Sequence, residues 1–511
     1  MLRIFFLLTP LTIPFNLLSA ANTPNIVLIL ADDLGYGDIG AYNPESKIPT
    51  PNLDRLARQG MLFTDAHSPS TVCTPTRYSI LTGRMAFRTK MRGVFTGVGG
   101  PGLIEENRLT LPQMLSNKGY RTALFGKWHI GMTFFDKEGN PINENGLEPV
   151  KRVDYSRPIP DAPIHRGFDE FFGTVSCPTT DWLYAYVDGD RIPNPPTKLL
   201  DHGPLPRHPY AQDSFIRRGM IAPGFDLEEV DLVFLKKSIS FLETHVRESP
   251  NQPFFLFHST QAVHLPSLPA NQFKGSTTAG PHGDFISELD SIVGTLMKTL
   301  ERLGVADKTL ILFSSDNGPE VVPTIRMRAD YGHDSARPWR GMKRDGWEGG
   351  HRVPLIARWP GKIKAGSTTD QILSLTDIMA TFAALVGSSL PNTAAEDSIN
   401  FLPVLLGTQR EEPIREYMLQ QTISLALSIR KGPWKYLNHR GSGGNRYNQS
   451  RLLHPFVLRE TAPEAPGQLY NLESDPGEIN NLYFERPNIL QELKTQLDNY
   501  VDSGRSAPVR K

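Results

Sequence analysis

The chain has 511 residues, which is long enough for two domains or for one large core with a smaller partner. Its 54 lysine and arginine residues balance 54 aspartate and glutamate residues, so the composition does not favour a nucleic-acid partner or a polybasic membrane surface. A hydrophobic content of 39% is typical of a soluble globular protein.

The first twenty residues have the pattern of a secretory signal peptide. Met1–Arg3 makes a short basic start, and Ile4–Leu18 is largely apolar. Leu18–Ala20 then offers the small residues that signal peptidase prefers. Because the apolar run is short for a membrane span, we predict a signal peptide over residues 1–20. The mature chain would be periplasmic or secreted, with no membrane attachment after cleavage.

Apolar runs rich in β-branched residues alternate with helical patterns along the mature chain. Asn25–Ala31 is such a run, and its composition is that of a strand buried on both faces of a sheet. Strands that alternate with helices predict an α/β sandwich with a large mixed, mainly parallel sheet. The other predicted strands are Ala123–Phe125, Pro253–His258, Thr309–Ser314 and Val353–Arg358. The predicted helices are Leu53–Gln59, Leu111–Lys118, Leu227–Val246, Phe285–Leu303 and Asp377–Val386.

Three stretches rich in proline, glycine, asparagine and aspartate predict long surface connections. Loops of this kind often shape the substrate pocket of a large enzyme. The three stretches are Lys137–Pro163, Arg191–Pro223 and Gly318–Arg337.

The pattern changes after residue 404. Short strands are predicted over Tyr417–Leu419, Ala426–Arg430 and Trp434–Leu437, and Pro487 suits the first turn of a final helix. We therefore predict one large domain over residues 21–404 and a small α+β domain with an antiparallel sheet over residues 405–511.

Cys73–Arg77 is the most informative short motif, in a chain with only one other cysteine, Cys177. A cysteine followed by proline two residues later and by arginine four residues later is a poor disulfide partner and a poor zinc half-site. Alone, the motif fits equally well a buried thiol beside a helix-capping turn, because short motifs recur by chance. The cysteine count also leaves open one disulfide between Cys73 and Cys177.

Carboxylates and an amide follow two of the predicted strands. Asp32 and Asp33 end the first strand, and Asp316 and Asn317 follow the strand that begins at Thr309. The carboxyl ends of parallel strands form a common ligand crevice, where unpaired carboxylates would repel one another. A cation would relieve this repulsion, and oxygen ligands favour calcium or magnesium over zinc. The alternative for each segment is a solvent-facing turn.

Four basic side chains follow the same strands or lie in nearby loops. Lys127 and His129 are two residues apart in a segment expected to be extended, so they would point to the same side. His264 lies just past another strand, and Lys343 precedes Trp347–Pro354. Each of these residues taken alone is more often a solvated loop residue.

Taken together, these segments resemble the type I, formylglycine-dependent sulfatases, which are arylsulfatase-like enzymes of the alkaline phosphatase superfamily. The resemblance runs through the mature chain and makes the large domain a catalytic sulfatase domain. The matching segments are Asn25–Val27, Asp32–Asp38, Cys73–Arg77, Gly126–His129, Asp316–Gly318, Glu348–Pro354 and Leu469–Glu478.

The resemblance implies a metal site and a modified nucleophile. Asp32, Asp33, Asp316 and Asn317, together with the modified Cys73, would bind one divalent cation, calcium in most relatives, with magnesium as the alternative. A separate maturation enzyme would oxidise Cys73 to formylglycine. One hydroxyl of the hydrated aldehyde would attack sulfur, and the second would drive the release of sulfate.

The resemblance also implies roles for the basic residues. Arg77 and Lys127 would hold the hydrated aldehyde and balance its charge, and His129 would assist the release step. His264 and Lys343 would contact the sulfate, with His264 as the general acid.

The predicted function is the hydrolysis of sulfate esters on a sulfated carbohydrate. One alternative is a phosphodiesterase or phosphonate monoester hydrolase of the same superfamily. Another is a non-catalytic protein that binds sulfated glycans and never matures Cys73. Pro178–Trp182 and Gly332–Trp339 offer polar and aromatic side chains to a sugar, although ordinary loops have the same composition.

Overall fold

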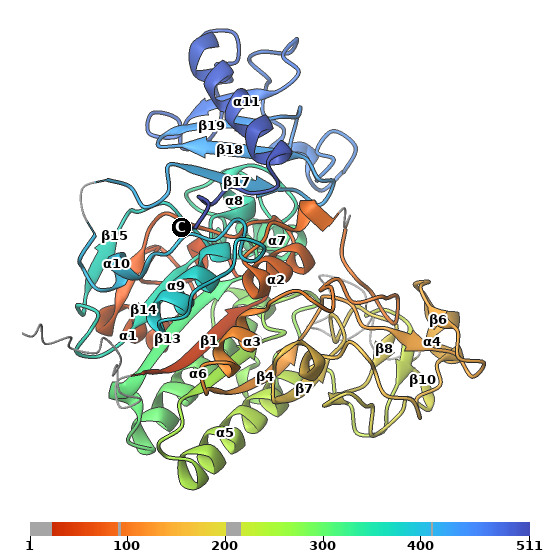
Figure 1. Cartoon of the computed structure of the whole chain (residues 1–511). Coiled ribbons are helices and arrows are strands. Elements are labelled where there is room, and N and C mark those ends of the chain that lie inside the picture. The colour runs from red at the N-terminus through yellow and green to blue at the C-terminus, as the bar shows by residue number, and fades with distance from the viewer. Residues whose placement is uncertain (1–22, 90–92, 201–215, 410–411, 511) are drawn as a thin grey trace, which may run out of the picture.

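The computed structural model of the chain describes residues 23–89, 93–200, 216–409 and 412–510. The predicted signal peptide over residues 1–20 lies outside these residues. Within them, no helix is both long and apolar enough to cross a membrane. A central sheet of nine strands in this part of the chain has helices on both faces (Figure 1).

The central sheet is mainly parallel, as predicted. Its strand order is β15-β2-β14-β13-β1-β12-β4-β7-β9, and the five strands from β13 to β7 run parallel to one another. β14 and β9 pair antiparallel with their neighbours and make the sheet mixed. The strands are β1 (Asn25–Ala31), β2 (Met61–Phe63), β4 (Arg121–Lys127), β7 (Glu170–Thr174), β9 (Val187–Asp188), β12 (Phe254–Ser259), β13 (Thr309–Ser315), β14 (Leu355–Arg358) and β15 (Ser367–Thr369).

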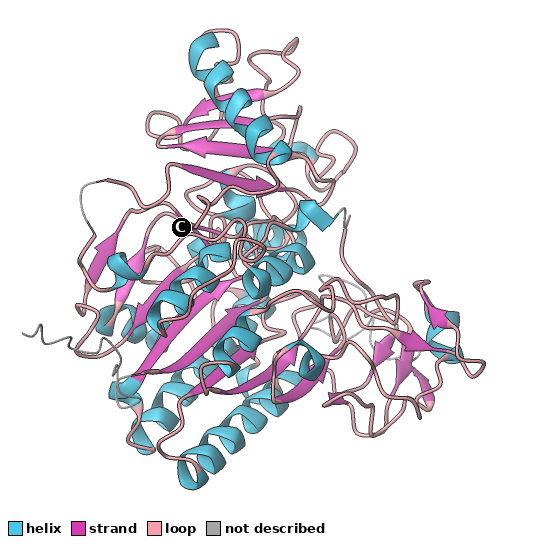
Figure 2. Cartoon of the chain, in the orientation of Figure 1, coloured by secondary structure: helices cyan, strands magenta, loops and turns pink. Residues whose placement is uncertain are grey.

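Two groups of helices sandwich this sheet. Ile26 to Ala31 of β1 are fully buried, because α5 and α6 cover one face and α2, α3 and α9 cover the other (Figure 2). Burial on both faces explains why the strand is apolar at every position instead of alternating. The helices are α1 (Pro51–Gln59), α2 (Cys73–Thr82), α3 (Leu111–Ser116), α5 (Val230–Glu248), α6 (Gly280–Arg302) and α9 (Ile378–Leu385).

The three predicted connections contain more regular structure than the sequence suggested. Lys137–Pro163 contains β6 (Pro141–Ile142) and α4 (Leu147–Arg152), and Gly318–Arg337 contains α7 (Val321–Arg326). In the described part of Arg191–Pro223, β10 (Lys198–Leu200) pairs with β11 (Gly219–Ile221). These elements are too short to produce a readable periodicity, so the sequence did not predict them.

The C-terminal part forms a four-stranded antiparallel sheet covered by a helix, shown in blue in Figure 1. Its own core includes Ile429, Leu469 and Leu493. The fourth strand, β20, was not predicted as a strand. The elements are β17 (Tyr417–Gln421), β18 (Leu427–Lys431), β19 (Trp434–Leu437), β20 (Gln468–Asn471) and α11 (Pro487–Asp502).

Candidate active site

Four oxygen-bearing side chains meet at the carboxyl ends of two adjacent strands. Ala31 of β1 pairs with Ser315 of β13, so the residues that follow, Asp32 and Asp316, lie side by side. Asp33 and Asn317 complete the group, and all four side chains are fully buried. The parallel register therefore brings together residues that are more than 280 positions apart in the sequence.

A cationic or amide partner holds each carboxylate of this group. The Lys127 ammonium forms an ion pair with Asp32, and Arg77 Nε donates to Asp316 Oδ2 over 2.8 Å. Lys343 Nζ lies 2.7 Å from Asp33 Oδ2. Asn317 Nδ2 donates to Asp33 Oδ1 over 2.7 Å, which turns the Asn317 carbonyl oxygen toward the other side.

Burial and charge have opposite effects on the two neighbouring aspartates. Burial opposes ionisation of Asp32, but the charges of Lys127, His264 and Arg77 outweigh it and hold the pKa of Asp32 well below its usual range. Burial together with the negative charge of Asp32 raises the pKa of Asp316 to about 6. Two adjacent carboxylates without a bound cation cannot both ionise easily.

The donor set fits a hard divalent cation. Asp32 Oδ1 and Asn317 Oδ1 are buried and have no hydrogen-bond partner among the described residues. Ligand atoms of Asp32, Cys73 and Asp316 lie within 4.8 Å of one another. Buried oxygens without donors are costly, and a cation that accepts oxygen ligands would satisfy them.

Cys73 is the first residue of α2 and lies in the wall of the cavity beside this acidic group. Arg77 follows one helical turn later, so both side chains lie on the same face of α2. Arg77 Nη1 also donates to the Lys127 carbonyl oxygen over 3.1 Å and to Ser259 Oγ over 2.5 Å. Both cysteines are free, so the open possibility of a disulfide between Cys73 and Cys177 is not realised.

His129 reaches the site by a route that the sequence did not indicate. β4 ends at Lys127, and His129 has φ of +60°, so the predicted extended segment does not exist at this point. The His129 ring lies within hydrogen-bond distance of the Phe95 carbonyl oxygen, 2.8 Å from Nε2. Lys127 therefore borders the site as the last residue of β4, whereas His129 does so because of a left-handed turn and not because of strand alternation.

His264 and Cys177 lie next to each other in the wall of the cavity. His264 Nε2 lies 3.6 Å from Cys177 Sγ and 3.8 Å from Asp33 Oδ2, and Nδ1 is 2.7 Å from the Leu265 carbonyl oxygen. Burial lowers the pKa of His264, but the negative charges of Cys177 and Asp33 reverse this effect and raise it to about 9. The sequence had given Cys177 no role, because nothing near it in the chain indicates a site.

His264 and Cys177, together with Cys73, His129 and Lys343, border a cavity of about 240 Å³. Larger cavities of about 540 and 420 Å³ exist elsewhere, but no predicted site residue lines them. The predicted loop over Gly332–Trp339 does not line the cavity, since His333 instead bonds to Asp38 Oδ1 over 2.8 Å. The lining includes Cys73, His129, His264 and Lys343, and also Thr180 and Asp181 of the predicted sugar-contacting segment Pro178–Trp182. Cys177, Arg217, Glu320 and Arg344 line it as well and were not predicted as site residues.

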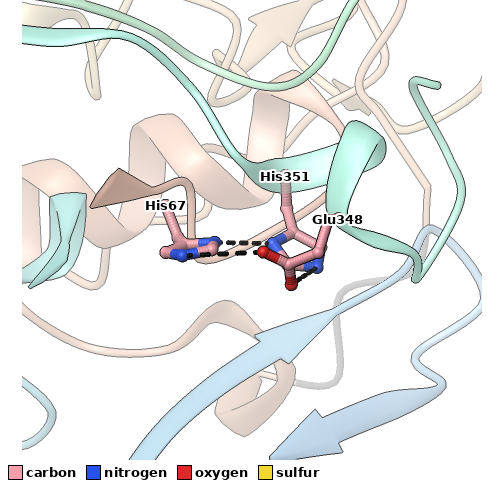
Figure 3. A group of neighbouring side chains, drawn as sticks. All are labelled: His67, Glu348 and His351. Carbon is pink, nitrogen blue, oxygen red and sulfur yellow. Dashed lines mark hydrogen bonds and ion pairs between the residues drawn. The ribbon is translucent and has the colours of Figure 1, made fainter. Parts of the chain in front are cut away.

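A second group of potential metal ligands, His67, Glu348 and His351, lies against the C-terminal sheet (Figure 3). His67 Nδ1 and His351 Nδ1 are 3.0 Å apart. The Lys435 ammonium lies 3.0 Å from both Glu348 Oε1 and His351 Nε2. Because Lys435 already supplies the positive charge, we interpret this group as a buried ionic network and not as a metal site.

Comparison with known proteins identifies the chain's relatives. Residues 24–388 match the family model described as sulfatase, and residues 341–503 match the model described as N-sulphoglucosamine sulphohydrolase, C-terminal. N-acetylgalactosamine-6-O-sulfatase of Bacteroides thetaiotaomicron is 34% identical over 93% of each chain. Human arylsulfatase A is 33% identical over 96% of this chain and 92% of its own length.

Solved structures agree with these matches. A sulfatase of Bacteroides thetaiotaomicron, determined in work on glycosaminoglycan metabolism, has a TM-score of 0.78 at 31% identity and covers 94% of this chain and 99% of that chain. The PsFucS1 sulfatase from Pseudoalteromonas has a TM-score of 0.70 at 26% identity, with 96% and 92% covered. The predicted α/β architecture and the predicted family are both confirmed. The chain belongs to the sulfatase family.

Proposed function

We propose that this sulfuric ester hydrolase acts on sulfated carbohydrates with formylglycine, made from Cys73, and one divalent cation. Sulfatases generally depend on formylglycine and on a metal. The observation that carries the proposal is the position of Cys73, which lines the cavity and lies within ligand distance of Asp32 and Asp316. No other cysteine of the described residues lies beside the acidic group in this way.

The cation would be held by Asp32, Asp33, Asp316 and Asn317, with calcium preferred and magnesium as the alternative. The buried, partnerless oxygens of Asp32 and Asn317 support this assignment. When bound, the cation supplies positive charge that lowers the pKa of a neighbouring hydroxyl. Arg77 and Lys127 would keep the acidic ligands oriented, since each already forms an ion pair with one of them.

The hydrated formylglycine supplies an oxygen nucleophile for sulfur and a second hydroxyl that allows sulfate to leave. Arg77 and Lys127 would balance its negative charge. His129 would assist the release step, and its contact with the Phe95 carbonyl oxygen fixes the orientation of the ring.

His264 and Lys343 would bind the sulfate group and the leaving oxygen. The raised pKa of His264, about 9, keeps its ring protonated at neutral pH, as a general acid requires. Lys343 is held between Asp33 Oδ2 at 2.7 Å and Glu320 Oε2 at 3.4 Å, so its ammonium group is placed without a ligand.

The substrate class that we select for the first assay is a 6-O-sulfated N-acetylhexosamine. A relative at 34% identity is named N-acetylgalactosamine-6-O-sulfatase. The cavity volume of about 240 Å³ lies below the roughly 300–1,000 Å³ of pockets for drug-sized ligands. Such a cavity favours one sulfated sugar unit over a long buried oligosaccharide.

Two further parts of the proposal concern maturation and location. A formylglycine-generating enzyme would be a transient partner, because the chain encodes cysteine at position 73. Export, with cleavage near Ala20, is inferred from the apolar N-terminal pattern.

The proposal is tested with chain co-expressed with a maturation enzyme. Mass spectrometry of the peptide that contains Cys73 should show a loss of about 18 Da, the difference between cysteine and formylglycine. The same preparation should release sulfate from sulfated saccharides and should not release the alcohol from phosphate diesters. Exclusive phosphodiester hydrolysis would support the phosphodiesterase alternative. An unmodified thiol together with tight glycan binding would support the non-catalytic one.

A further inference from the structure

Two arginines border the cavity and have no part in the proposed chemistry. Arg217 and Arg344 both line the space that contains Cys73, His264 and Lys343. A guanidinium group in a substrate cavity is commonly a ligand for carboxylate or sulfate oxygens, because its planar N–H donors match their geometry.

Arg344 has a backbone conformation that ordinary side chains rarely adopt. Its φ is +83°, in the left-handed region that favours glycine. The backbone is fixed there by the Arg344 N–H, which donates to the Thr71 carbonyl oxygen over 2.9 Å. Strained residues of this kind concentrate at functional sites, so a large charged side chain at this position indicates a use for the charge.

The Arg344 side chain is oriented by a buried carboxylate and keeps donors to spare. Nη1 and Nη2 bond to the two oxygens of Glu320 over 2.5 and 2.9 Å. Nε has no hydrogen-bond partner among the described residues, and the side chain is 33% exposed. Of the five N–H donors of arginine, the edge formed by Nε and Nη2 is therefore available for a second anion.

Arg217 supplies a second guanidinium group without a carboxylate partner in the described part of the chain. Its Cζ atom lies over the Trp182 ring, 4.2 Å from the ring centroid, in a cation–π contact that holds the guanidinium group in place. Its neighbour Arg218 is exposed and does not line the cavity. Of these two consecutive residues, only Arg217 borders the cavity, so Arg218 can serve as a control.

We propose that Arg217 and Arg344 form an anion-binding subsite beside the position of the sulfate ester. The preferred substrate then carries a second anionic group, a carboxylate or another sulfate, on the sulfated sugar or on the unit joined to it. This inference rests on the proposed function and narrows its substrate class. Glu320 acts as a positioning residue, because it holds both Arg344 and Lys343.

The subsite is tested by binding, so that turnover is not needed. Full-length chain with Cys73→Ala is titrated calorimetrically with three probes: a 6-sulfated N-acetylhexosamine, its 4,6-disulfated form, and the 6-sulfated sugar joined to glucuronic acid. We expect at least one dianionic probe to bind about 10-fold more tightly than the monosulfated sugar, the order of one charge-assisted hydrogen-bond pair. The preferred dianionic probe identifies the anion as sulfate or carboxylate.

Three variants in the same background locate the effect. Arg344→Gly accommodates the positive φ and should fold, and Arg217→Gln removes the second guanidinium. Each should reduce the preference for the dianionic probe to less than about 3-fold. Arg218→Gln removes the same charge at an exposed position and should retain the full preference for the dianionic probe. In the Cys73→Ala background itself, added salt should weaken this preference.

Several outcomes overturn the subsite. Equal affinity of the unsubstituted background for all three probes does so, as does binding of none of them. An unchanged preference in both Arg217→Gln and Arg344→Gly does so as well, and loss in only one variant contradicts a subsite formed by the pair. A matured chain that releases no sulfate would overturn the proposed function while leaving these binding ratios to decide the subsite.

Discussion

Both the position and the charge of His264 support its proposed role as the general acid. Its Nε2 atom points toward Cys177 and Asp33, and its Nδ1 atom is held by a backbone carbonyl. Neighbouring negative charge overcomes the effect of burial on its pKa, so the ring is positively charged at neutral pH. A buried, oriented imidazolium at the wall of a substrate cavity is suited to protonate a leaving group.

Replacing His264 should therefore have an effect that depends on the leaving group. For His264→Asn we expect a loss of about 10²–10⁴-fold in kcat/KM with a sulfated sugar, whose alkoxide needs a proton. With 4-nitrophenyl sulfate the loss should be much smaller, since nitrophenolate leaves without protonation. Steady-state kinetics with both substrates checks this. Equal losses would assign His264 to sulfate binding and contradict an acid role.

The acidic group makes a prediction about metal removal. Chelation should abolish sulfatase activity and lower the Tm, because the cation binds the folded chain and not the unfolded one. Calcium or magnesium should restore both, and the more effective ion identifies the natural one. Activity that survives exhaustive chelation would contradict a resident cation.

Asp316→Asn tests the ligand set without removing a side chain. We expect cation affinity to fall by at least about 100-fold. Substituting a residue that only hydrogen-bonds to a metal ligand already lowers metal affinity roughly 10–100-fold. The Tm of this variant should no longer respond to calcium at concentrations that stabilise the parent chain. Thermal titration of both proteins measures the difference, and identical titrations would remove Asp316 from the ligand set.

At the scale of elements, the site depends on how closely β4 approaches β12. A methyl group at Gly126 would lie 1.7 Å from the Ser259 carbonyl oxygen, and φ at Gly126 is +130°. Only glycine fits between the two strands at this point, directly before Lys127. The close approach places the Lys127 backbone where its carbonyl accepts from Arg77 and from Ser259 Oγ.

Gly126→Ala should therefore destabilise the sheet and displace Lys127. We expect the free energy of unfolding to fall by about 3 kcal/mol or more. Gly119→Ala is the matched control, because Gly119 also has positive φ, +86°, but has open space around it. The control should lose only the backbone cost of roughly 1–2 kcal/mol. Equal losses in urea denaturation would show that the contact with β12 does not matter.

At the scale of the molecule, a buried ionic network joins residues near the edge of the central sheet to the C-terminal sheet. His67 Nε2 bonds to Asp65 over 2.6 Å, and Arg430 of β18 holds the same aspartate with two bonds of 2.7 Å. Lys435 of β19 donates a hydrogen bond to His351 Nε2 over 3.0 Å. Because His351 Nε2 accepts from Lys435, the proton of this ring is on Nδ1, which donates to His67 Nδ1. Each ring then has one acceptor nitrogen, so we assign both rings as neutral.

This assignment predicts acid sensitivity. Burial lowers the pKa values of His67 and His351, and for His351 the charge of Lys435 lowers it further. The unfolded chain therefore takes up protons below about pH 6.5 that the folded chain does not, and stability falls as the pH falls. Each histidine contributes up to about 1.4 kcal/mol per pH unit below that value.

Urea denaturation between pH 7.5 and pH 5.5 measures this slope. His351→Gln should lose stability less steeply than the parent chain as the pH falls, although it is less stable at pH 7.5. His454→Gln, at an exposed histidine, is the control and should leave the slope unchanged. A His351→Gln slope equal to that of the parent would contradict the neutral histidine pair.

The local sequence pattern was enough to predict those elements whose composition or first residues are typical of a buried strand or of a helix start. The buried central strands are mostly apolar because helices cover both faces, and this composition is visible in Ile26–Ala31 of β1. Proline at the start of α11 marks the beginning of the final helix. β20 was missed because its residues are stabilised by pairing with β19 and not by a pattern of their own.

The sequence by itself predicted the family, the mainly parallel sheet and the acidic side chains that follow β1 and β13. Only the tertiary structure decided which further side chains share the cavity. Glu320 and Arg344 meet through folding of a loop, and Cys177 meets His264 across 87 positions of sequence. Such contacts depend on how loops return to the sheet edge, and no local spacing encodes that path.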